Sequence, residues 1–208
     1  RVLTARDVGL AASMNLPWLA VRRKPRIALL ATGDEIVMPG DPIGPHQIIS
    51  SNAIALASFI EASGGTATDL GIAPDSADAL RTMAKGAHGA DMLVTSGGAS
   101  VGDHDLVQRV LGDIGLEVDF WKIAMRPGKP LIFGHIGTTL LLGLPGNPVS
   151  AMVCAAIFLG PALRTMLGVH AGEKRFGGAL VRRHDGLGVA RAMAVDMTDG
   201  LVQIESSA

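Results

Sequence analysis

The sequence lacks most features of secreted, membrane-bound and thiolate-metal proteins. Its single cysteine, Cys154, excludes an intramolecular disulfide and a cysteine-ligated metal site, and favours a reducing cytoplasm. No signal sequence opens the chain, and the apolar run 152–158 is too short to span a bilayer. The formal net charge of −1 gives no reason to expect nucleic acid or an acidic membrane surface as a partner.

Two common catalytic arrangements are missing as well. No serine–histidine–acid arrangement is visible, and the six histidines lack metal-ligand spacing. His104 is expected to be an exposed loop residue. Hydrophobic residues make up 48% of the chain and charged residues 18%, which indicates a globular protein with a large buried interior.

From Arg26 onward, apolar runs of strand length alternate with segments of helical spacing. The pattern predicts strands over 27–31, 66–73, 91–95, 117–124, 131–134 and 138–142, the last two joined by a turn at 135–137. It predicts helices over 51–62, 77–87, 105–114 and 148–167. Such alternation predicts an α/β fold in three layers, with a mostly parallel sheet and helices on both faces.

The two ends of the chain depart from this alternation. Residues 1–24 predict a short helix capped by Thr4, a strand at Leu19–Val21 and a basic linker, as at the end of an N-terminal domain. Residues 169–208 predict part of a C-terminal β domain with strands at 178–183, 189–196 and 201–205. The α/β domain itself is expected over 25–168. Because the chain does not begin with methionine, we expect a fragment of a longer protein.

The most informative motif is the glycine-rich loop Ser96–Asp105, between a predicted buried strand and a predicted helix. Glycines allow close approach of the backbone to a ligand, and free N–H groups at a helix start attract anions. The aspartates of this loop would repel a bare phosphate, so they indicate a metal ion or a proton-transfer role. A plain strand-to-helix turn is the alternative.

Three further polar clusters follow predicted strands or open predicted helices: Thr32–Glu35, Pro74–Ser76 and Gly143–Ser150. Ligands of open parallel sheets bind outside the carboxyl ends of the strands, so we expect all four clusters at one edge. The acidic side chains there suit magnesium: Glu35, Asp75, Asp103 and Asp105. The cations after the fourth predicted strand suit a phosphate or another oxyanion: Lys122, Arg126 and Lys129. A solvated loop is the alternative for these cations.

The order and spacing of Thr32–Glu35, Ser96–Asp105, Arg126–Pro130 and Gly143–Ala151 resemble the molybdopterin molybdotransferases. These molybdenum-insertion enzymes are related to the C-terminal domain of gephyrin. The resemblance covers about residues 20–168 closely and implies the molybdopterin-binding fold.

The resemblance also implies an activity and its partners. Adenylylated molybdopterin and molybdate are the implied substrates; the adenylyl–phosphate bond is cleaved, AMP leaves, and molybdenum remains on the dithiolene sulfurs with the help of magnesium. The implied assembly is a cytoplasmic homodimer with the site between subunits, and the molybdopterin adenylyltransferase is an implied partner. Two alternatives stay open: adenylyl transfer to molybdopterin, and a non-catalytic pterin-binding scaffold.

The resemblance finally implies roles for individual residues. The implied catalytic and magnesium-binding residues are Glu35, Asp75 and Asp105. Counting the loop cations, the expected substrate-binding residues are Thr32, Gly33, Asp34, Ser96, Gly97, Gly98, Ser100, Lys122, Arg126, Lys129, Pro145, Gly146, Asn147, Pro148 and Ser150.

Overall fold

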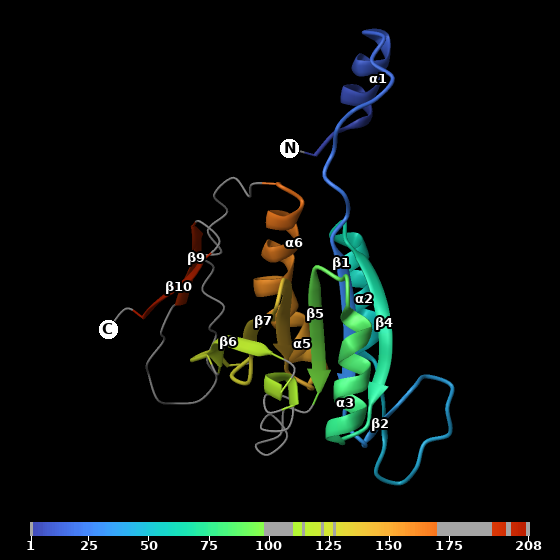
Figure 1. Ribbon diagram of the computed structural model, residues 1–208, viewed down its shortest axis with the longest axis vertical. Coiled ribbons are helices and arrows are strands. Elements are labelled where there is room, and N and C mark those ends of the chain that lie inside the picture. The colour runs from blue at the N-terminus through green and yellow to red at the C-terminus, as the bar shows by residue number, and fades with distance from the viewer. Residues whose placement is uncertain are drawn as a thin grey trace, which may run out of the picture.

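The computed structural model describes residues 2–97, 110–113, 115–121, 123–126 and 128–169, and the backbone of 193–198 and 201–206. Its main sheet contains six strands: β1 (Arg26–Thr32), β4 (Thr66–Ala73), β5 (Met92–Gly97), β6 (Leu116–Trp121), β7 (Ile132–Ile136) and β8 (Thr139–Leu144). The strand order is β4-β1-β5-β8-β7-β6 (Figure 1). The first four strands in this order are parallel, and β7 and β6 are antiparallel to their neighbours. The predicted α/β fold with a mostly parallel sheet is confirmed.

Helices cover both faces of this sheet because the strand side chains alternate between two cores. Ile27 and Leu29 of β1 pack in one core with α2 (Asn52–Ala62) and the helical run 148–166. Ala28 and Leu30 pack in the other core with α3 (Ala77–Ala84). All residues of β1 after Arg26 are buried, which explains its uninterrupted apolar sequence.

The last helix of the domain is a continuous helical run with a π-helical middle. It consists of α5 (Pro148–Cys154), a π turn (Ala155–Leu159) and α6 (Gly160–Met166). By length and composition, the whole helix Pro148–Met166 could cross a membrane, although the apolar run 152–158 within it is too short to do so. A core helix passes the same criterion, and Cys154 and Leu159 are fully buried against the sheet. Burial raises the pKa of the Cys154 thiol to about 11, as suits a neutral core side chain.

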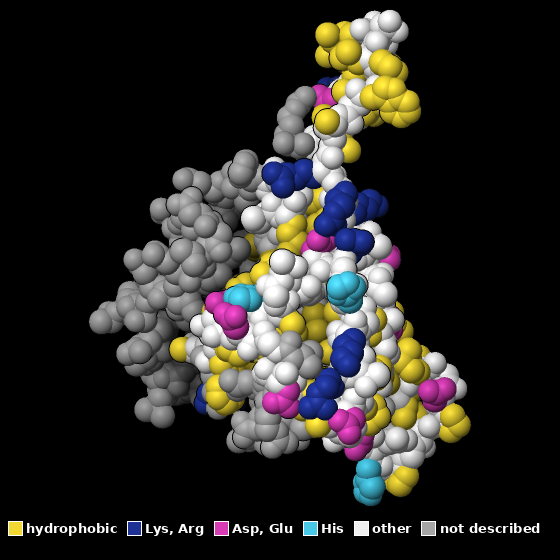
Figure 2. All heavy atoms as spheres, viewed as in Figure 1, with side chains coloured by type: hydrophobic (Ala, Val, Ile, Leu, Met, Phe, Trp, Pro, Cys, Tyr) yellow, Lys and Arg dark blue, Asp and Glu magenta, His cyan; other side chains and the backbone are white. Residues whose placement is uncertain are grey.

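The N-terminal residues form an arm that projects from the body (Figure 1). Its helix α1 (Ala5–Ser13) begins with the predicted cap, in which Thr4 and Asp7 form a capping box. The predicted strand at Leu19–Val21 is wrong: these residues form no strand with any described part of the chain, and the side chains of Leu19 and Val21 are 43% and 68% exposed. Hydrophobic side chains of the arm are exposed on its surface (Figure 2).

Several predicted boundaries are shifted. β6 ends at Trp121 rather than at 124, and the turn after β7 falls at 137–138 rather than 135–137. A 3-10 turn (Lys85–Ala87) completes the predicted helix 77–87. The sequence did not predict the short parallel pair β2 (Ile36–Val37) and β3 (Ile48–Ile49).

Two predicted regions are described only in part. The helix expected over 105–114 is seen at 110–113, and its other residues lie outside the described ones. In the expected β segment, β9 (Met193–Thr198) pairs antiparallel with β10 (Leu201–Ser206). The strand expected at 178–183 also lies outside the described residues.

A bidentate ion pair ties the linker to the amino-terminal end of the sheet. The Arg23 guanidinium donates to both carboxylate oxygens of Asp91, at 2.5 and 2.6 Å, and the Arg26 backbone N–H donates to the same carboxylate at 2.7 Å. The hydrogen bond from Arg23 is the main reason why the pKa of Asp91 is lowered to about 2. The pair therefore joins the segment before β1 to the residue before β5.

We expect Asp91→Asn to lower the free energy of unfolding at neutral pH. The pKa of about 2 in the folded chain lies below the value of about 3.9 in an unfolded chain. The carboxylate therefore stabilises the fold above about pH 4, and this contribution is lost as the pH falls toward about 2. Urea unfolding at pH 7 and at stepwise lower pH measures the difference between wild type and variant. Asp119→Asn, at an exposed position of β6, is the control. The stabilising role of the Arg23–Asp91 pair is contradicted if the loss of unfolding free energy in Asp91→Asn does not shrink on acidification, or if Asp119→Asn loses as much.

Candidate functional site

A polar cleft of about 520 Å³ lies where the carboxyl ends of β1, β5 and β8 meet. Parallel strands bring the loops that follow them to one edge of the sheet, as the sequence predicted. Nine of the predicted site residues line this cleft: Thr32, Glu35, Ser96, Gly97, Pro145, Gly146, Asn147, Pro148 and Ser150. Eight other lining residues were not predicted: Ile36, Ile48, Ile49, Ser50, Ser51, Asn52, Gly128 and Pro130.

Main-chain atoms meet closely in this cleft. Gly97 has a φ of +99°, and a Cβ there would collide with the carbonyl oxygen of Thr32. A Cβ on Gly146 would stand 3.2 Å from the Cα of Gly97. The loops after β5 and β8 therefore approach each other and the end of β1 at a distance that side chains would prevent. Glycine allows this close approach; that backbone groups of these loops contact a ligand stays a prediction.

The carboxylate of Glu35 folds back over the turn that follows β1. It occupies the space beside Gly33 where a Cβ would stand, and Gly33 adopts a φ of +133°. The Gly33 backbone N–H donates to the Ala73 carbonyl at 3.3 Å, which joins this turn to the end of β4. Glu35 therefore lies at the cleft, close to the strand ends.

Asp34 and Asp75 link the same two loops by exchanging backbone hydrogen bonds. The Asp75 N–H donates to the Asp34 carboxylate at 3.0 Å, and the Asp34 N–H donates to the Asp75 carboxylate at 3.4 Å. Asp75 is not among the residues lining the cleft, although its loop is tied to the loop of Glu35. Asp105, the third predicted catalytic residue, lies outside the described residues, as do Gly98, Ser100 and Asp103.

The predicted magnesium site is not assembled by the described side chains alone. Within residues 2–97 and the described parts of 110–169, no group of three or more His, Cys, Asp and Glu side chains is arranged to hold a metal ion. Glu35 and Asp75 supply the hard oxygens that magnesium prefers. The predicted third ligand is Asp105, so the described residues do not fit the ion by themselves.

The predicted cations belong to a loop that reaches the cleft. The Ile123 N–H donates to the Lys129 carbonyl and the Leu131 N–H to the Gly128 carbonyl, both at 3.1 Å, so the loop between β6 and β7 is held at its base. Gly128 and Pro130 line the cleft. The neighbouring side chains of Arg126 and Lys129 are exposed and not part of the lining, while Lys122 lies outside the described residues.

Fewer backbone N–H groups are free at the helix start after β8 than the sequence suggested. Asn147 caps α5: its side-chain oxygen accepts from the Ser150 N–H at 3.1 Å and from the Ser150 hydroxyl at 3.3 Å. Pro148, in the first turn, has no N–H to offer. An anion at this turn therefore meets fewer free backbone donors than the sequence predicted.

Asn52 is the clearest functional candidate that the sequence analysis missed. Its side-chain nitrogen donates to the Gly146 carbonyl at 2.7 Å, which fastens the start of α2 to the loop before α5. Ser51 and Asn52 stand at the start of the helix predicted over 51–62, but Ser51 makes no side-chain capping bond. The only sign of Asn52 in the sequence was its place beside another polar residue, and we interpreted that pair as part of the helix rather than of the cleft.

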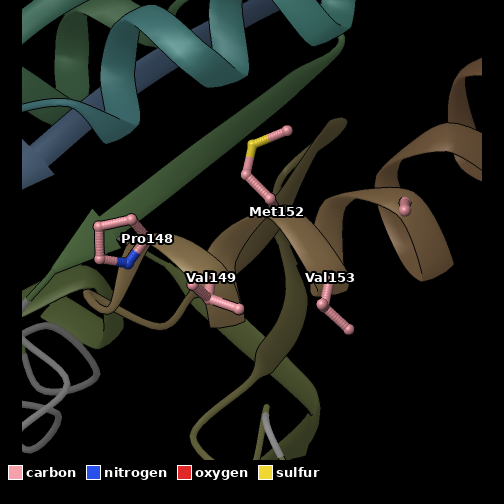
Figure 3. A pocket seen from close by; sticks show the side chains of 5 residues that line it. Pro148, Val149, Met152 and Val153 are labelled. Carbon is pink, nitrogen blue, oxygen red and sulfur yellow. The ribbon is translucent and has the colours of Figure 1, made fainter. Parts of the chain in front are cut away.

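A second hollow lies on the outward side of α5 (Figure 3). It is lined by Pro148, Val149, Met152, Val153 and Ala156, so its side chains offer no hydrogen-bonding group. Substrates with phosphate groups require polar partners. The polar cleft is therefore the better candidate site.

Comparison with known proteins gives one family match and several similar chains. A family model described as "Probable molybdopterin binding domain" matches residues 28–165. A molybdopterin molybdenumtransferase from Nostoc sp. is 38% identical over 190 residues, which are 89% of this chain and 43% of the relative. Gephyrin from Dictyostelium discoideum is 33% identical over 191 residues, covering 78% of this chain and 26% of the relative.

A solved structure is similar as well. The crystal structure of a molybdopterin biosynthesis MoeA protein from Pyrococcus horikoshii aligns with a TM-score of 0.72 and 35% identity, covering 80% of this chain and 41% of that one. The chain therefore spans less than half the length of these relatives.

We expect Gly97→Ala to destabilise the protein by about 2 kcal/mol or more, because it combines a positive φ with a collision against the Thr32 carbonyl. Thermal unfolding monitored by circular dichroism measures the loss. Gly112→Ala is the matched control, since a Cβ there meets no atom within 4 Å. Equal melting temperatures for both variants would contradict the close packing of the strand ends.

Proposed function

The chain belongs to the family of probable molybdopterin-binding domains, and on this premise we propose that it acts in molybdenum cofactor biosynthesis as a molybdopterin molybdenumtransferase. The proposed substrates are adenylylated molybdopterin and molybdate. The proposed products are AMP and a pterin whose dithiolene sulfurs carry molybdenum.

The observation that carries the proposal is the composition of the cleft. Its loops pack closely at Thr32, Gly97 and Gly146, and it is also lined by neutral polar residues, among them Ser51, Asn52 and Ser150. Lys129 lies next to two of the lining residues, Gly128 and Pro130. Neutral polar residues at the cleft together with cations on an adjoining loop suit a substrate that carries phosphate groups.

Individual residues have distinct roles in this proposal. Arg126 and Lys129 attract and orient the oxyanion, whether it is molybdate or the phosphate beside the bond that breaks. Glu35 holds a proton-accepting oxygen at the cleft, where it orients the attacking water. Asp34 and Asp75 keep the loop of Glu35 in register with the end of β4. Binding of magnesium requires Asp105 in this proposal, so the assay below is run with and without magnesium.

The assembly and location of the protein are part of the same proposal. A homodimer with residues of both copies at the site, contact with the molybdopterin adenylyltransferase and a cytoplasmic location rest on the resemblance of the sequence motifs. Analytical ultracentrifugation of the chain tests the first of these directly, because a monomer at all concentrations contradicts it.

The decisive assay supplies adenylylated molybdopterin, with and without molybdate and magnesium, and measures AMP. We expect AMP release that requires molybdate, and a turnover at least about 100-fold lower in Glu35→Gln, as for loss of a group that moves a proton. Glu61→Gln, at the end of α2, serves as the control.

Three outcomes of this assay would contradict the proposal. In a parallel reaction that contains ATP and free molybdopterin in place of the adenylylated pterin, consumption of ATP without molybdate favours the adenylyltransferase. Binding of the pterin without any turnover favours the scaffold. Equal activity of Glu35→Gln and wild type removes Glu35 from the mechanism.

Loss of the loop cations should weaken oxyanion binding. A hydrogen bond to a charged partner contributes about 1.5 kcal/mol or more, so Lys129→Ala and Arg126→Ala should each weaken molybdate binding roughly tenfold. The wild-type affinity should also fall as salt is added. Isothermal titration with molybdate measures both effects, with Lys85→Ala after α3 as the control. Unchanged affinity in both loop variants would assign Arg126 and Lys129 to a solvated loop.

A further inference from the structure

The two loop cations, Arg126 and Lys129, have no charged partner that fixes their position. Both side chains are exposed, and neither forms an ion pair with another described residue. A long exposed cation does not hold one place by itself, because ordering it costs conformational entropy. The distance of these cations from the cleft therefore depends on the backbone that carries them. Gly128, directly before Lys129, is the part of that backbone that lines the cleft.

Gly128 is packed so tightly that no side chain fits there. It is buried and adopts a φ of +120°, and a Cβ at this position would stand 2.8 Å from the sulfur of Cys154 and collide with the methyl end of Met125. The end of a long methionine side chain can move aside. The Cys154 sulfur cannot, because it lies one bond from Cβ on a fully buried helical residue. Cys154 is therefore the fixed neighbour of Gly128.

Cys154 connects this loop to the helix that begins at the cleft. It lies on α5, one helical turn after Ser150, which lines the cleft. Residues four apart in a helix share a face. Because burial raises the pKa of the thiol to about 11, the side chain is neutral at pH 7 and acts on Gly128 by packing alone. One face of α5 thus supplies both a residue of the cleft and the side chain against which the loop packs.

The two ends of the loop are held separately. The Ile123 N–H donates to the Lys129 carbonyl and the Leu131 N–H to the Gly128 carbonyl, both at 3.1 Å. The side chains of Ile123 and Leu131 are buried in the same hydrophobic core as Cys154. With these ends fixed, the contact between Gly128 and Cys154 determines where the middle of the loop lies.

We propose that Cys154 is a positioning residue for oxyanion binding: its small side chain, packed against Gly128, sets how close the two loop cations stand to the cleft. A larger side chain at position 154 would push Gly128 and the cations away from α5, whereas one of equal size would leave them in place. Hydrogen bonds to an oxyanion weaken steeply when the donor is misplaced. Cys154 itself contacts no ligand. This inference rests on the proposed function, in which the loop cations bind the oxyanion.

The test compares substitutions of different size at position 154, by isothermal titration of the whole chain with molybdate. Cys154→Val adds a methyl group and should weaken molybdate binding about tenfold, as much as loss of one loop cation. Cys154→Ser keeps the size and should bind as wild type does, although a buried hydroxyl costs free energy. Leu163→Val, in the same core on α6, is the control: it should lower the melting temperature and leave molybdate affinity unchanged.

A double-mutant cycle tests the contact between the two residues. Gly128→Ala places a methyl group against the Cys154 sulfur and should weaken molybdate binding. Cys154→Ala removes that sulfur, so the double variant should regain part of the lost affinity. The rest of the loss remains because alanine is strained at the positive φ of Gly128. If the effects of the two single substitutions simply add, the contact does not control oxyanion binding and the proposal is wrong.

Hydrogen–deuterium exchange at residues 123–131 follows the loop without any ligand. Exchange in this segment should be faster in Cys154→Val than in wild type, because the larger side chain displaces the loop from α5. Cys154→Ser and Leu163→Val should exchange as wild type does in the same segment.

The outcomes separate this inference from the proposed function. Equal molybdate affinity of Cys154→Val and wild type overturns the positioning role even when AMP release is observed, and so does an affinity that follows the melting temperature instead of the size at position 154. Unchanged exchange at 123–131 in Cys154→Val overturns it as well. If wild type binds no molybdate while exchange follows the size at position 154, support of the loop by Cys154 stands and the oxyanion site of the proposed function is overturned.

Discussion

The close approach of main chain at the ends of β1, β5 and β8 is the constraint on which the candidate site depends. A Cβ on Gly97 would collide with the Thr32 carbonyl, and a Cβ on Gly146 would press against the Cα of Gly97 at 3.2 Å. Once these three strand ends are fixed, the side chains that follow them are fixed too. Glu35 and Asn147 reach the same cleft from loops more than 100 residues apart in sequence.

Two helix starts and a loop with cationic side chains lie beside these packed strand ends. The starts of α2 and α5 are joined through Asn52 and the Gly146 carbonyl, so two helix ends share one loop. The α5 end is capped by the Asn147 side chain, whereas Ser51 makes no side-chain capping bond at the α2 end. Arg126 and Lys129 follow from a separate loop next to the cleft.

Much of this architecture was predictable because the local sequence and the fold agree. The uninterrupted apolar run of β1 needs cover on both faces, and the structure supplies it with α2 on one side and α3 on the other. The positions of Gly97 and Gly146 also followed from the pattern, since glycine-rich turns after parallel strands converge at one edge.

The elements and residues that the sequence predicted wrongly or did not predict have physical explanations. The apolar residues Leu19 and Val21 indicated a strand, but within the described residues no strand pairs with them, and apolar composition alone does not make a sheet. The two-residue strands β2 and β3 are too short to leave a periodic signal, although they carry three residues of the cleft. Asn52 was missed because a side chain that bonds a loop 94 residues away leaves no trace in local spacing.

The central claim is that the cleft at the strand ends, and not the apolar hollow on α5, receives the pterin. Hydrogen–deuterium exchange of the chain with and without adenylylated molybdopterin tests it most directly. We predict that the ligand slows exchange at residues 32–36, 48–54 and 143–150, and leaves 152–156 and the arm at 2–21 unchanged. Protection confined to 152–156 or to the arm, with none at the strand ends, would contradict the account.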